Sequence, residues 1–192
     1  MNNRRLTPIG LFMIIYGALF IGIPDFSWLS FWVYVVIVSL FLLLTVIVDL
    51  TKKRKRKDKL DAFAGYVAFL LMSFFLNFPA IKLAHKSIEM QLLLVFIWTL
   101  LNYFTYKYRH IMKKVTLSRS NEYRIYKYLY HGFGFVVLVA GGGGFYKTPE
   151  YFSYTFGHDA TMIYFSIILL LFSYWLTVFA TSTARIFDLN NP

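Results

Sequence analysis

Long apolar runs separated by short polar segments dominate the pattern along this chain. A helix needs about 20 apolar residues to cross a hydrocarbon layer ~30 Å thick, and most of these runs approach or exceed that length. The pattern therefore predicts an all-α, polytopic helical bundle in a membrane, with about six transmembrane helices. The expected spans are residues 6–23, 29–50, 61–81, 88–106, 128–146 and 161–180.

The fifth of these stretches is the least certain to cross. Its uncharged core runs from Gly132 to Tyr146 and holds 15 residues. At about 1.5 Å per residue, such a helix reaches only ~22 Å. The alternative is therefore a bundle of four spans accompanied by membrane-associated helices.

Composition supports a membrane protein. Hydrophobic residues make up 58% of the 192 residues and aromatic residues 21%, whereas a soluble domain has roughly 45–50% apolar residues. The absence of cysteine excludes disulfides and thiol nucleophiles. Residues 6–23 follow the basic start MNNRR like a signal peptide. No small-residue cleavage pattern follows, so we expect an uncleaved first span.

The placement of positive charge predicts the orientation. If the N-terminus is cytoplasmic and six spans alternate, seventeen of the twenty Lys and Arg residues lie on the cytoplasmic side, and only Lys82, Lys86 and Lys147 lie outside. Such asymmetry is typical of inner-face loops. We therefore expect both termini and the basic loops 51–60 and 107–127 to be cytoplasmic. No soluble domain fits between the spans, so residues 1–192 form a single transmembrane domain.

The loop at 107–127 is long enough to hold its own helix. Tyr108, Ile111, Met112 and Val115 share one helical face, while Lys113 and Lys114 lie off that face. Two interpretations stay open: a basic interfacial helix, or a cytoplasmic extension of the fourth span.

A run of four glycines stands in the sequence VAGGGGFYKT at 139–148. A phosphate loop requires a second glycine five residues after the first, and that position holds Tyr146. Ala140 and Gly144 are instead four apart, the spacing of a small-residue helix contact. The other interpretation is that the run unwinds the helix into an exit loop or a pore-lining bend.

Polar residues inside the expected spans are the candidates for intramembrane function, because burying them in lipid is costly. They are Asp49, Asn77, Asn102 and His131. For Asn77 and Asn102 the sequence favours interhelical hydrogen bonds. For Asp49 it favours a pair with Lys52 or Lys53 at the membrane boundary, and for His131 a capping or interface position.

No pattern typical of an enzyme is present. The sequence lacks a nucleophile elbow, paired carboxylates within a span and a metalloprotease helix. His85 and Glu89 are spaced for one helix face, and His158 and Asp159 lie in a second outer loop. Two histidines from separate loops are weak evidence for a zinc site. We therefore predict no enzyme activity, no catalytic metal and no cofactor.

The most unusual feature is a run of six consecutive cations in the loop at 51–60. A topology anchor alone would explain part of it. The run, together with Lys113 and Lys114, also suits anionic lipid headgroups or an acidic soluble protein. The predicted binding residues are Lys52, Lys53, Arg54, Lys55, Arg56, Lys57, Lys113 and Lys114. Direct nucleic-acid binding is not expected.

The size, the multi-span layout and the basic cytoplasmic loops resemble the membrane component of the Kiwa antiphage defence system. The resemblance implies a homo-oligomer in the bacterial cytoplasmic (inner) membrane, which detects phage attack and works with a soluble, DNA-associated partner. The sequence thus favours a non-enzymatic sensor or scaffold. The alternatives are a small channel or transporter, lined by the intramembrane polar residues and the glycine run, and a colicin-type immunity protein.

Overall fold

The computed structural model describes residues 17, 22–23, 25–51, 54–117, 122–142 and 147–183, and the side chains of Asp49 and residues 54–58 lie outside that description. The described part is helical and contains no strand. Its elements are α2 (Trp28–Leu50), α3 (Arg54–Leu83), the short 3₁₀ helix η1 (Ala84–Lys86), α4 (Ile88–Lys107), α5 (Arg109–Leu117), α6 (Arg124–Ala140), α7 (Thr148–Phe156) and α8 (His158–Thr183).

Four of the described helices are long and apolar enough to cross a membrane. They cover Trp28–Val48, Lys59–Lys86, Ile88–Lys107 and His158–Ser182. The predicted class of helical membrane protein is confirmed, and these four match the expected second, third, fourth and sixth spans. The expected first span at 6–23 lies almost wholly outside the described residues. The expected fifth span is not among the four, because α6 holds 17 residues and ends at Ala140.

Helix α3 departs most from its expected bounds. It begins at Arg54 and contains 30 residues, so that it is about 45 Å long and exceeds a hydrocarbon layer of ~30 Å. The expected loop at 51–60 is therefore mostly helix. At its other end α3 continues through Pro79 to Leu83, although proline removes one helical hydrogen bond. The neighbouring turns hold the helix in register.

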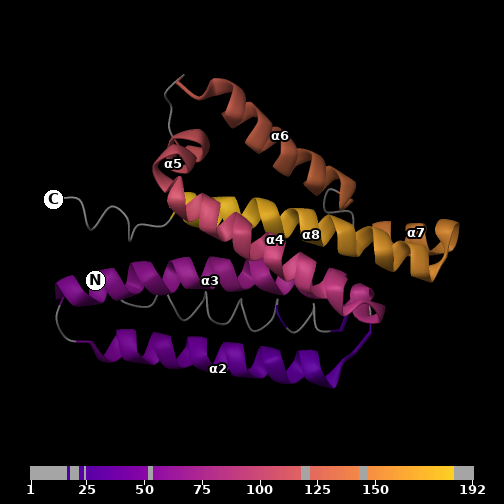
Figure 1. The fold of residues 1–192 in the computed structure, drawn as a ribbon, viewed down its shortest axis with the longest axis horizontal. Coiled ribbons are helices and arrows are strands. Elements are labelled where there is room, and N and C mark those ends of the chain that lie inside the picture. Colours follow the sequence, from indigo (N-terminus) through magenta and orange to yellow (C-terminus); the bar gives the residue numbers. More distant parts are fainter. Residues whose placement is uncertain are drawn as a thin grey trace.

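The core lies where α3 packs on α2 and α8 (Figure 1). Aromatic and branched side chains of α2 and α3 form one cluster, in which Tyr34 and Phe75 lie with ring centroids 5.4 Å apart. Gly17, a described residue of the expected first span, is buried and lies against these same two rings. Helix α8 packs against α3, α4, α5, α6 and α7.

The direction of the helices follows from their contacts. Ser73 contacts Ser173, and Phe69 contacts Phe179, so α3 and α8 run antiparallel. The hydroxyl of Thr181 donates to that of Thr105 at 3.2 Å, at the C-terminal ends of α8 and α4. Helices α4 and α8 are therefore parallel, as Figure 1 shows.

Helix α5 settles the interpretation of the loop at 107–127. The chain turns at Tyr108 after α4 ends, and a separate nine-residue helix follows. Val115 is buried, Met112 is partly buried, and Lys113 and Lys114 are exposed as predicted, but Tyr108 and Ile111 of the predicted face are exposed too. Because α5 packs on α8 and α6, it is a distinct amphipathic helix and not an extension of the fourth span.

Candidate functional site

One end of the bundle carries most of the described positive charge. We call this end the basic end and define it by the start of α3, by α5 and by the start of α6. Tyrosine and cation pairs surround it: Lys107 lies over Tyr103 and Tyr108, Arg109 over Tyr106, Lys114 over Tyr123 and Arg124 over Tyr128, at 5.1–6.0 Å from the ring centroids. Such rings are typical of a membrane interface, so the positions of these pairs indicate where along the bundle an interface would lie.

The predicted binding residues gather at this basic end where the structure describes them. Arg54, Lys55, Arg56 and Lys57 form the first turn of α3, although their side chains lie outside the description, as do Lys52 and Lys53 entirely. Lys113 and Lys114 lie on α5. The chain therefore brings the start of α3 and helix α5 to the same end of the bundle (Figure 1).

Lys114 forms an ion pair with Glu122 at this end. Its Nζ lies 3.0 Å from Oε2 of Glu122, and about half of each side chain is exposed. The hydrogen bond and the charge of Glu122 raise the pKa of Lys114. The pair is exposed and screened by salt, so it contributes little to stability. It does hold the start of the 122–124 turn against α5.

The intramembrane polar candidates do not meet. Asn77 is buried on α3, and its Nδ2 reaches the carbonyl of Ser73 one turn away at 3.5 Å. Asn102 Nδ2 donates to the carbonyl of Trp98 at 2.8 Å. Within the described residues both bonds stay inside one helix, so the interhelical bonds expected for Asn77 and Asn102 remain predictions. His131 is exposed on α6, beside the ring of Tyr130. The expected pair of Asp49 with Lys52 or Lys53 lies outside the described side chains.

A hydroxyl of α3 provides an interhelical contact among the described residues. Ser73 Oγ lies 3.0 Å from the carbonyl of Ser173 and also contacts the hydroxyl of Thr177. In return Ser173 donates to the carbonyl of Ser73 at 2.7 Å. The indole Nε1 of Trp98, on α4, donates to Ser73 Oγ at 2.9 Å. Ser73 therefore joins three helices at one buried point, which we call the hydroxyl node.

Sequence reasoning missed the hydroxyl node, although a signal was present. Ser166, Ser173, Thr177 and Thr181 follow at spacings of seven, four and four, and all are buried in α8. Such spacing places small polar side chains on one helix face. In membranes such faces allow close packing and hydrogen bonds between helices. The polar candidates predicted from the sequence were Asp, Asn and His side chains, all larger than those of serine and threonine.

The glycine run ends a helix. Helix α6 stops at Ala140, and Gly142 has φ of +100° beside the side chain of Thr148. The exit interpretation is therefore correct for Gly141 and Gly142, while Gly144 lies outside the described residues. The carbonyl of Ala140 accepts a hydrogen bond from the hydroxyl of Tyr164 at 2.7 Å.

The close helix contact occurs at another glycine. Gly134 is buried, and a Cβ added there would lie 2.5 Å from Nε1 of Trp175. That nitrogen donates to the carbonyl of Tyr130 at 3.3 Å, and the Trp175 ring stacks on Tyr130. The absence of a side chain at Gly134 thus lets α6 lie on α8.

No metal centre is present in the described part of the chain: no three His, Asp or Glu side chains there lie close enough to share an ion. His85 and Glu89 belong to different helices, η1 and α4, and a ring nitrogen of His85 contacts the carbonyl of Lys82 at 3.1 Å. Their i, i+4 spacing therefore does not place them on one helix face.

Comparison with known proteins gives no relative. The chain matches no protein family, no curated protein and no solved structure.

Proposed function

We propose that this chain is a non-enzymatic, multi-pass membrane scaffold that recruits an acidic soluble protein through its basic end. The observation that carries the proposal is the continuity of α3. This helix runs unbroken from the cations at Arg54 to the hydroxyl node at Ser73 and on to Leu83. A protein held at the cations is therefore coupled by a rigid helix to the centre of the bundle.

The charge pattern supports a binding surface beyond a topology anchor. Five cations at the basic end are exposed or partly exposed: Lys59, Lys113, Lys114, Arg124 and Lys127. Helix α5 holds its two lysines away from the buried Val115. Clustered cations at a membrane face attract acidic surfaces and anionic headgroups, with about 1 kcal/mol for each Lys or Arg near anionic lipid. An acidic protein seated there would contact α3, α5 and α6 together.

The orientation belongs to the same proposal: six crossings, with both termini in the cytoplasm of a bacterial inner membrane. Helices α4 and α8 are parallel, so the chain between them must return across the layer. Helix α6 is the segment that runs back: Tyr130 is opposite Trp175 and Ala140 is opposite Tyr164. It follows α8 over 11 residues, or about 16 Å. The aromatic helix α7 completes the return.

A topology experiment tests this orientation. We expect a cysteine at Lys113 to be protected from an impermeant maleimide in intact cells, and a cysteine at Tyr154, an exposed residue of α7, to be labelled. The chain has no cysteine of its own, so each signal has one source. Labelling of both positions, or of neither until the cells are opened, would show that α6 and α7 do not return across the membrane.

Recruitment is tested by removing four cations. We expect the variant in which Lys53, Arg54, Lys55 and Arg56 are all replaced by Gln to insert normally, because Lys52, Lys57 and Lys59 remain for orientation. Capture of an acidic partner from native membranes should fall at least about tenfold, since four charges near the surface contribute roughly 1 kcal/mol each. The measurement is co-purification at physiological salt.

The matched control for recruitment is Lys86→Gln at the opposite end. Lys86 is exposed on η1, whereas Lys82 is unsuitable because its amine holds the loop before α2. The control should retain capture. Equal capture by the four-residue variant and by Lys86→Gln would mean that the basic run only orients the chain in the membrane and binds no partner.

The oligomeric state, the role in antiphage defence and the alternative functions are further hypotheses within this proposal. Homo-oligomerisation and a role in antiphage defence rest on the resemblance to the Kiwa membrane component. A small channel has less support, because among the described residues Asn77 is buried on α3 whereas His131 is exposed on α6, so these candidates do not line one path. The colicin-type immunity alternative has no residue that favours it.

A further inference from the structure

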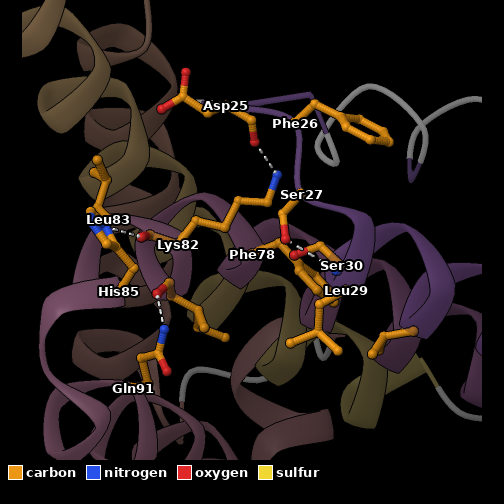
Figure 2. A pocket seen from close by; sticks show the side chains of 12 residues that line it. Asp25, Phe26, Ser27, Leu29, Ser30, Phe78, Lys82, Leu83, His85 and Gln91 are labelled. Carbon is orange, nitrogen blue, oxygen red and sulfur yellow. Dashed lines mark hydrogen bonds between the residues drawn. The ribbon is translucent and has the colours of Figure 1, made fainter.

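A cavity of about 530 Å³ lies at the end of the bundle opposite the basic end. The loop before α2, the first turn of α2, the last turns of α3 and the start of α4 surround it (Figure 2). Its volume lies within the roughly 300–1,000 Å³ of small-molecule sites. The cavity has no part in the proposed function, and the inference below does not rest on that function.

The deeper wall of the cavity is apolar. Leu29 and Val33 of α2 face Phe78 and Ile81 of α3 across it. Val33 and Phe78 lie more than one turn inside the ends of their helices, toward the hydrocarbon layer, whereas Leu29 and Ile81 belong to the terminal turns. A hydrocarbon chain placed there would lie against apolar groups on two helices.

The rim of the cavity presents hydrogen-bond donors and positive charge. Lys82 Nζ donates to the carbonyls of Ile23 at 3.2 Å and Asp25 at 2.9 Å, which holds its charge at the rim. Helix α2 also begins at this rim. Its N-cap is Ser27, whose Oγ accepts from the backbone N of Ser30 at a long 3.5 Å. Helix N-termini carry unpaired N–H groups and a partial positive charge. An anionic group therefore suits this rim.

The Asp25 carboxylate is the negative group near this rim. In Figure 2 it points away from the Lys82 amine, and only its backbone carbonyl accepts from that amine. The other polar side chains are turned toward the end of α3, because Gln91 donates to the carbonyl of Ile81 at 3.1 Å and His85 contacts that of Lys82. The side chain that brings a cation to the rim is thus Lys82, whose charge also interacts with that of Asp25.

Aromatic residues fix the depth of the cavity in the membrane. Phe26, Trp28, Phe31 and Trp32 form a chain of ring contacts around the start of α2, with centroids 5.1–6.0 Å apart. Trp28 is 68% exposed and Trp32 59% exposed. Exposed tryptophans gather at the level of the lipid headgroups. The rim therefore lies at headgroup level, and the apolar wall lies at the level of the acyl chains.

We propose that this cavity binds a phospholipid of the leaflet opposite the basic end, with its anionic headgroup at Lys82 and the α2 N-terminus. The acyl chain lies along Leu29, Val33 and Phe78. The arrangement matches an amphiphile in order, charge and depth, and a soluble anion would leave the apolar wall without a partner.

Photo-labelling tests the assignment with the full chain in nanodiscs of phosphatidylcholine. The probes are phosphatidylglycerol and phosphatidylcholine with the same diazirine acyl chain. We expect the phosphatidylglycerol probe to label peptides containing residues 25–33 and 78–83 above all other membrane-facing peptides. Lys82→Gln should lower that labelling about fivefold, the effect of one cation near anionic lipid, and leave the phosphatidylcholine signal unchanged.

A second pair of variants tests the cavity without touching its charge. Val33→Trp fills the apolar wall and should abolish the selective labelling, while Val36→Trp, on an exposed part of α2 outside the cavity, should retain it. Equal labelling by both probes, or labelling that survives Val33→Trp, would leave only bulk lipid around the helices and overturn the site. Displacement of the probe by inorganic phosphate alone would overturn the lipid assignment.

Discussion

Replacing Gly134 by alanine is expected to loosen α6 from α8. The new Cβ would lie 2.5 Å from Nε1 and 2.7 Å from Cε2 of Trp175. The Trp175 ring cannot easily move, because it stacks on Tyr130, Phe172 and Phe179 with interplanar angles of 13–15°. Forcing a methyl group into a packed site costs about 1–3 kcal/mol. We expect the Gly134→Ala variant to unfold at a lower SDS fraction in mixed micelles.

The control for this change lies two positions away, on the opposite side of the same helix. Gly132 is exposed, and a Cβ there meets nothing within 4 Å. Gly132→Ala should be neutral or stabilise α6 by roughly 0.5–1 kcal/mol, because alanine has less backbone freedom to lose. The two alanines should therefore shift the SDS midpoint in opposite directions. Equal shifts would mean that Gly134 is not a contact point.

The same change has a consequence for function. Arg124 and Lys127 lie in the first turns of α6, so a displaced α6 moves two cations of the basic end. Under the proposed function, Gly134→Ala should weaken partner capture even though it alters no charge. Gly132→Ala should leave capture intact.

Removing the Ser73 hydroxyl is expected to weaken the centre of the bundle by about 2 kcal/mol. Ser73→Ala takes away the acceptor of Trp98 Nε1 and the partner of Ser173 and Thr177. A buried donor left without a partner costs about 1–3 kcal/mol, although single interhelical bonds in membranes average roughly 0.6 kcal/mol. The node exceeds that average because one hydroxyl serves α4 and α8 together. The free energy of unfolding in SDS titrations measures the loss.

A double-mutant cycle separates the node from a simple cavity effect. Trp98→Phe removes the indole donor, and the pair Ser73→Ala with Trp98→Phe should cost less than the sum of the single changes. Thr99→Ala is the matched control, since that exposed hydroxyl donates only to Val95 in its own helix at 2.8 Å, and it should change stability by less than about 0.5 kcal/mol. Additive costs for Ser73 and Trp98 would contradict a shared bond.

The sequence alone determined the class of the protein and the place of its long helices. Whether a helix can cross the bilayer depends on the length of its own apolar run. The bounds of α2, α4 and α8 therefore lie within a few residues of those expected. The burial of Val115 on α5 and the helix exit at Gly141 also followed from local spacing and from glycine itself.

Only the tertiary structure decided which small residues hold the helices together. The sequence pointed to Asn77 and Asn102 for hydrogen bonds between helices, whereas among the described residues Ser73 makes them, and a tight glycine contact lies at Gly134. Ser73 meets Ser173 across 100 positions, and nothing local at either residue specifies the partner. Apolar length and net charge add along the chain, but a packed contact depends on which two distant faces meet. That is why the spans could be predicted, and why the hydroxyl node and the cavity at Lys82 could not.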